Sequence, residues 1–171
     1  MNKRMQLVPR CISEDEPCVR CVMHPWMYSE KKQKLKRETV LPAPNRKDVS
    51  LLRLNYTNID FCIQHGKKLS NANATFTCLA TLHRGNLKKL NGLSDSEVAW
   101  AGIKSEIIYG PMHQGHYVLD RDVFVDDDNV ELPMHADLTY NKTSDGDVST
   151  RMRQYASQLV KMMKIIHKES V

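Results

Sequence analysis

The sequence predicts an α+β protein with a mixed or antiparallel sheet of about five or six strands and two or three helices, the last of them C-terminal. Short runs rich in Val, Leu, Tyr, Phe and Thr are separated by Pro, Gly, Asn and Asp, the residues that favour turns. Two segments instead have apolar residues three and four apart, at residues 58–65 and 149–171. The connections are too irregular for repeated β-α-β units, and a small, partly closed barrel is the alternative.

Length and composition indicate one globular domain. The chain has 171 residues, of which 26% are charged and 41% apolar, so it can bury a sizeable core. We expect a single α+β domain over residues 1–148 and a C-terminal amphipathic helix over residues 149–171 that docks on it. No apolar run approaches the roughly 20 residues of a membrane span, and the N-terminus lacks the apolar core of a secretory signal. These features predict a cytoplasmic protein with reduced cysteines and no membrane partner.

The strands of the first half follow from residue type. Residues 1–13 are predicted to be an irregular lead-in. Strands are predicted at residues 18–23, 49–54 and 75–83, and residues 49–54 have the composition of a central strand. The basic run KKQKLKR, at residues 31–37, fits a solvated loop or the outer face of a helix.

One helix is predicted between these strands. Residues 58–65 carry an apolar stripe, and Thr57 or Asn58 is suited to cap the helix N-terminus. Gly66 is expected to end the helix, since glycine is the usual residue just beyond a C-terminus. A short helical turn is expected at residues 87–90.

A hairpin at residues 116–140 is predicted to be the element around which the fold is organised. Residues 117–125 are its first expected strand, and the sequence DDDN at residues 126–129 is its expected turn. The second expected strand runs from Val130 through His135 and Asp137. Residues 100–109, rich in isoleucine, are predicted to form a further strand.

The final helix is predicted from its cap and its period. Ser149 or Thr150 is suited to cap it, and its apolar residues recur at intervals of three and four. These residues are Met152, Tyr155, Ala156, Leu159, Met163 and Ile166. We expect this stripe to pack on the sheet; the alternative is that it faces a partner protein.

His135 and Asp137 are the first candidates for a catalytic role. A strand period of two places both on one face, opposite Met134 and Leu138. A histidine and an aspartate so placed can orient a base, hold a metal or bind a polar ligand. The alternative is that both are simply solvated on an exposed face.

Two further histidines are catalytic candidates. His113 and His116 lie in the segment GPMHQGH, in which two glycines permit close approach to a ligand. The alternative is that they are loop histidines without a role.

Arg20, Ser50 and Arg53 are candidate ligand-binding residues. Two arginines and a serine on adjacent strands can bind a phosphate or a dinucleotide. Together with the four catalytic candidates they would form one polar cleft if the fold brings them to the same side of the sheet.

Three cysteines and a histidine have spacing that resembles a zinc site. Cys11, Cys18, Cys21 and His24 supply thiolate and imidazole, the ligands zinc prefers. However, residues three apart on a strand point to opposite faces, so Cys18 and Cys21 cannot meet at one ion if residues 18–23 are a strand. We therefore predict no bound metal and no cofactor, with the cysteines as buried, inert thiols.

Four short segments carry a resemblance to a group of small bacterial proteins without an established activity. These segments are Val19-Arg20 followed by Pro25, the strand containing Val49-Ser50, the small-residue run at 77–80, and Pro133-Met134-His135-Ala136-Asp137-Leu138. The resemblance covers about residues 13–140. It implies a bacterial cytosolic protein encoded near defence or toxin genes.

Two functions of different classes remain open. The first is a non-enzymatic accessory or protein-interaction component of a bacterial multi-protein system, because established enzyme motifs are absent and the chain has a net charge of +5. The second is a small enzyme that acts on a phosphate-containing or nucleotide substrate through the polar cleft. Nucleic acid is a possible but disfavoured partner, because no aromatic residues interleave with the lysines to stack bases.

Overall fold

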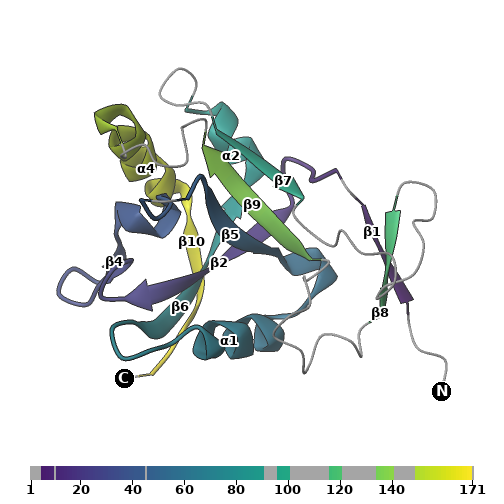
Figure 1. Ribbon diagram of the computed structural model, residues 1–171, viewed down its shortest axis with the longest axis horizontal. Helices are drawn as coiled ribbons and strands as arrows, with labels where there is room; N and C mark the ends of the chain where they lie inside the picture. The colour runs from purple at the N-terminus through teal and green to yellow at the C-terminus, as the bar shows by residue number, and fades with distance from the viewer. Residues whose placement is uncertain are drawn as a thin grey trace.

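The computed structural model describes residues 5–9, 11–44, 46–90, 96–100, 116–120, 134–140 and 149–170. It confirms the α+β class: a six-stranded antiparallel sheet has the strand order β10-β6-β2-β5-β9-β7, with α-helices packed on it (Figure 1). The strands of this sheet are β2 (Pro17–His24), β5 (Asp48–Arg53), β6 (Thr75–His83), β7 (Ser96–Trp100), β9 (His135–Tyr140) and β10 (Lys164–Lys168). The helices are the 3₁₀ turns η1 (Arg37–Val40) and η2 (Leu54–Tyr56) and the α-helices α1 (Ile59–Lys68), α2 (Arg84–Lys88) and α4 (Thr150–Met162).

Two small two-stranded sheets complete the described elements. β1 (Met5–Pro9) pairs with β8 (His116–Asp120), and β3 (Tyr28–Ser29) pairs with β4 (Lys34–Leu35). None of the described helices is long and apolar enough to cross a membrane.

The centre of the sheet agrees with the strands predicted for the first half of the chain. β2, β5 and β6 correspond to the predicted strands at residues 18–23, 49–54 and 75–83. β6 has seven consecutive buried residues, because it lies between β10 and β2 and is covered on both faces. A strand buried on both faces needs apolar residues at every position rather than at alternate ones.

The two faces of the sheet pack against different helices. On one face Val19, Leu52 and Leu79 contact Cys62 of α1. On the other, Leu51 and Leu138 belong to a cluster with the α4 residues Met152, Tyr155, Ala156 and Leu159. The sheet is therefore the middle of three layers, with an α1 face and an α4 face.

Helix α1 begins as predicted and ends later. The Asn58 side chain accepts a hydrogen bond from the Phe61 amide at 2.8 Å, which confirms the N-cap. The prediction that Gly66 ends the helix is wrong, because α1 continues to Lys68. A Cβ atom at Gly66 would lie 2.5 Å from the Phe76 ring, so this glycine lets α1 approach β6 closely.

The C-terminal segment is helix followed by strand. Ser149 caps α4 by accepting a hydrogen bond from the Met152 amide at 3.1 Å, as predicted. The prediction of a helix over residues 149–171 is wrong beyond Met162, because Lys164–Lys168 form β10 and pair with β6. The two adjacent isoleucines of β10 suit a strand, and the pairing supplies the neighbour that the β6 edge needs.

The predicted hairpin at residues 116–140 is also wrong in its pairing. β8 pairs with β1, so residues 5–9 of the expected irregular lead-in form a strand. β9 pairs with β5 and β7. The expected turn at residues 126–129 lies outside the described residues.

Two smaller predictions are partly corrected. The helical turn expected at residues 87–90 is the helix α2, which begins three residues earlier, at Arg84. The strand expected at residues 100–109 shares only Trp100 with β7, and residues 101–109 lie outside the described ones.

Candidate functional site

His135 and Asp137 lie side by side on the α1 face of the sheet. Ala136 and Leu138 between and beyond them are buried on the α4 face, which confirms the predicted period of two within β9. Met134, expected opposite His135, instead packs in the cluster on the α1 face, because it precedes the first residue of the strand. His135 Nε2 is 3.1 Å from Asp137 Oδ1, and the side chains are 28% and 23% exposed. These two atoms are shielded from solvent, and their contact lacks hydrogen-bond geometry. A buried imidazole against a carboxylate can accept or deliver a proton if a substrate reaches it.

His65 lies on α1, the helix that covers this face of the sheet, and no sequence motif marks it. It lies in the last turns of α1, and its ring stacks on Phe61 with the ring centres 6.2 Å apart. Burial lowers the pKa of His65, and the nearby charges of His135 and Lys68 lower it further. No sequence signal could have found His65, because it and His135 belong to elements 70 positions apart.

Arg20 lies on the opposite, α4 face of the sheet. Its Cα is paired with that of Ala80, which packs there with Val22. Its guanidinium donates to the carbonyl oxygens of Thr39 at 3.0 Å and Ser50 at 3.2 Å. Burial lowers the pKa of Arg20. Arg20 therefore ties β2 to η1 and β5, rather than facing His135.

Arg53 forms a buried ion pair. Its Nε is 2.6 Å from Glu16 Oε1, and one of its terminal nitrogens is 3.0 Å from Glu16 Oε2. A further hydrogen bond reaches the Cys11 carbonyl at 3.3 Å, and the guanidinium lies 4.6 Å from the centre of the Tyr56 ring. Glu16 neutralises the positive charge of Arg53, and a phosphate ligand would need that charge for binding.

The seven candidate residues do not form one polar cleft. His135 and Asp137 meet, and the Ser50 Cα is opposite that of Asp137 across β5 and β9. Arg20 lies on the other face, so the condition set for the cleft is not met. His113 lies outside the described residues. His116 begins β8, away from the main sheet, and was wrongly expected in a loop.

The cysteines confirm the geometric argument against a shared ion. Cys18 packs in the cluster on the α4 face and Cys21 in the cluster on the α1 face. Burial raises the pKa of Cys18 to about 12 and that of Cys21 to about 11. No group of three His, Cys, Asp or Glu side chains suited to a metal occurs in the described part of the chain.

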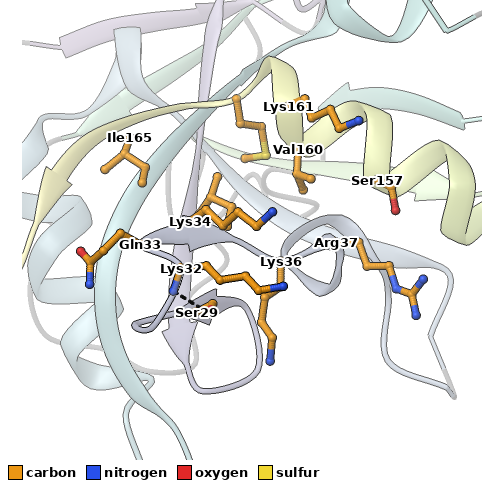
Figure 2. A pocket seen from close by; sticks show the side chains of 12 residues that line it. Ser29, Lys32, Gln33, Lys34, Lys36, Arg37, Ser157, Val160, Lys161 and Ile165 are labelled. Atoms are coloured by element: carbon orange, nitrogen blue, oxygen red, sulfur yellow. Dashed lines mark hydrogen bonds between the residues drawn. The ribbon is translucent and has the colours of Figure 1, made fainter.

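A basic groove lies between the β3–β4 hairpin with the start of η1 and the end of α4 with β10. Its volume is about 620 Å³, and Figure 2 shows side chains of both segments around it. Five basic side chains line it, and no carboxylate does: Lys32, Lys34, Lys36, Arg37 and Lys161. The remaining lining residues are Ser29, Gln33, Leu35, Ser157, Val160, Met163 and Ile165.

The basic side chains of the groove are largely uncompensated. Lys32, Lys34 and Lys161 have no ion-pair partner among the described residues. Lys36 Nζ donates to the Pro25 carbonyl at 2.9 Å, which leaves its charge in place. Arg37 has the exposed Glu38 carboxylate 3.4 Å away. Like charges concentrated at a hollow raise the local positive potential and attract anions.

The sequence indicated only half of this groove. Of the basic run at residues 31–37, residues 31–33 form the turn between β3 and β4, residues 34–35 form β4, and Arg37 begins η1. Lys161 joins them only because α4 docks beside η1. Comparisons with models of protein families, with curated proteins and with solved structures found no match, so a functional assignment rests on this chain's own residues.

Proposed function

We propose that the protein is a non-enzymatic component of a bacterial multi-protein system and that it acts by binding a protein partner. The observation that supports this most is the basic groove, where segments far apart in the sequence converge on one hollow of about 620 Å³. The bacterial, cytoplasmic and defence-associated setting comes from the sequence resemblance.

The composition of the groove favours binding over chemistry. Its hydroxyl groups come from Ser29 and Ser157, and no histidine or carboxylate lines it to serve as a general base. Ser29 Oγ accepts a hydrogen bond from the Lys32 amide at 3.2 Å, so it stabilises the turn. Cationic side chains around an open hollow suit electrostatic recognition of a partner.

The test is purification together with the products of neighbouring genes. Co-expression of the tagged protein with those products should yield a complex of fixed stoichiometry by size-exclusion chromatography with light scattering. Mass spectrometry then identifies the partner. Recovery of the protein alone, with every neighbouring product expressed, would contradict the proposal.

A second candidate is a small enzyme acting on phosphate-containing or nucleotide substrates, in which neither Arg20 nor Arg53 supplies the phosphate site. It is favoured by one observation. This is the 3.1 Å contact of His135 with Asp137, whose facing atoms have no hydrogen-bond partner. Such a pair can work as a base if a substrate displaces the contact.

The enzyme candidate has its own test. Hydrolysis of bis(p-nitrophenyl) phosphate by the purified protein, lost in His135→Ala while the thermal melt is unchanged, would favour it. A rate equal in wild type and His135→Ala would exclude this pair as its catalytic residues.

A further inference from the structure

We infer that the basic groove binds an extended, acidic segment of a protein partner that also carries aliphatic side chains. This inference rests on the proposed function, and it names the chemistry by which the partner is recognised.

The charge of the groove selects an anionic segment. Lys34 on the hairpin and Lys161 on α4 both line the hollow, and neither has an ion-pair partner among the described residues (Figure 2). Bringing unpaired lysines from separate elements to one hollow costs electrostatic free energy through mutual repulsion. A bound segment with several carboxylates removes that repulsion and replaces it with attraction.

The apolar part of the lining selects aliphatic side chains. Four aliphatic or thioether side chains lie among the lysines: Leu35, Val160, Met163 and Ile165. Ile165 is among the exposed large apolar residues, with 37% of its surface accessible. A ligand with aliphatic groups would remove this surface from water.

The same lining disfavours single-stranded nucleic acid. Proteins that bind it combine basic residues with aromatic rings on which bases stack, and no aromatic residue lines the groove. Phosphates would find partners in the lysines, whereas the bases would meet only aliphatic groups. A peptide satisfies both parts of the lining at once.

Strand edges beside the groove suit an extended chain. Ile165 belongs to β10, the outermost strand of the six-stranded sheet on that side. Leu35 belongs to β4, whose described pairing is with β3 alone. Extended peptides commonly dock along such edges, where side chains of alternate residues reach neighbouring hollows.

The experiment compares three fluorescein-labelled probes by anisotropy. Two are peptides of equal length and equal glutamate content, with leucine in one wherever the other has serine. The third is an oligothymidylate of equal charge. We expect the leucine peptide to bind about tenfold or more tightly than either of the others, because burying one leucine side chain contributes that much. Added salt should weaken all binding.

Variants separate the two parts of the lining. Lys34→Glu with Lys161→Glu should lower affinity for the leucine peptide at least about tenfold. The control, Lys47→Glu with Lys89→Glu, changes the net charge equally at two exposed sites that do not line the groove, and should bind like wild type. Ile165→Thr should abolish the preference for leucine over serine while salt-sensitive binding remains.

Several results would overturn the inference. Equal affinity for the leucine and serine peptides removes its apolar part. Tighter binding of oligothymidylate, lost in the Lys34 and Lys161 variant, makes the groove a nucleic-acid site. If the variant Lys34→Glu with Lys161→Glu forms the purified partner complex as the wild type does, the inference is overturned while the proposed function stands. Peptide binding as expected, with no partner recovered by the wild type, contradicts the proposed function alone.

Discussion

At the scale of single residues, Arg53 and Glu16 form an ion pair in the interior of the protein. Both side chains are almost inaccessible to solvent, and the arginine also reaches the Cys11 carbonyl, so the pair joins β5 to the segment before β2. Two charges without water are stable only while each satisfies the other. Arg53 was a reasonable ligand candidate from sequence, but its partner Glu16 lies 37 residues away and could not be assigned to it.

Glu16→Gln tests this pair. We expect the free energy of unfolding to fall by about 3–5 kcal/mol, because a buried arginine loses its counter-charge. Urea denaturation of the variant measures the loss. The double variant Glu16→Gln with Arg53→Leu should recover part of the stability, since it leaves no buried charge. A double variant less stable than Glu16→Gln would contradict this account.

The lowered pKa of His65 predicts how the stability of the folded protein depends on pH. The pKa of His65 in the folded protein lies below the ordinary histidine value of 6.5, chiefly because of burial. Below pH 6.5 the unfolded chain therefore binds a proton that the folded protein resists, and stability falls as the pH falls through this window. Denaturation curves at several pH values should show a smaller loss in His65→Gln than in wild type. Equal losses would mean that His65 does not contribute.

The cysteines predict a labelling pattern. Cys11 is exposed, and the other four cysteines are buried, with burial raising their pKa to between about 11 and about 12. Iodoacetamide at pH 8 should therefore modify Cys11 alone in the folded protein and all five cysteines in urea, as read by intact mass. We also predict that elemental analysis of the purified protein finds no stoichiometric zinc. One equivalent of zinc that survives dialysis would contradict this prediction.

At the scale of elements, α1 and β6 are in contact through Gly66 and Phe76. Alanine at position 66 would raise helix propensity by about 1 kcal/mol, since glycine is unfavourable within a helix. Its methyl group would, however, meet the Phe76 ring 2.5 Å away. Overpacking of this kind costs about 1–3 kcal/mol.

We therefore expect Gly66→Ala to lower the free energy of unfolding by up to roughly 2 kcal/mol, measured by urea denaturation. Gly66→Ala with Phe76→Leu should lose less than the two single losses added together, because leucine makes room for the methyl group. A Gly66→Ala protein more stable than wild type would show that α1 can move away from β6.

The elements differ in how far their sequences determine them. β6 was predictable because nine residues in succession suit a strand, and the α4 N-terminus because Ser149 caps it. The end of α4 was not predictable from the sequence, because Met163 and Ile166 continue the helical spacing of apolar residues by chance. Their segment is a strand because β6 offers an edge for pairing, and that edge lies more than 80 positions earlier.

At the scale of the whole molecule, the sheet joins segments remote in sequence. β2 lies between β5 and β6, and β9 lies between β5 and β7, so no hairpin of adjacent strands explains the main sheet. Sequence patterns identified β2, β5 and β6 and the shared face of His135 and Asp137, but they missed β1 and β10. They could not show that Arg20 faces the other way or that Lys161 approaches Lys34. Those facts depend on the strand order and on the docking of α4.

The place of β10 in the sheet has a consequence for synthesis of the chain on the ribosome. β10 begins 81 residues after β6 ends. At roughly 5–20 residues per second, the β6 edge that β10 covers stays open for roughly 4–16 s after β6 is made. β6 has seven consecutive buried residues, so it is then exposed in the form most prone to join another nascent chain. During that interval the exposed edge is the part of the chain that needs protection from such pairing, until β10 is made and covers it.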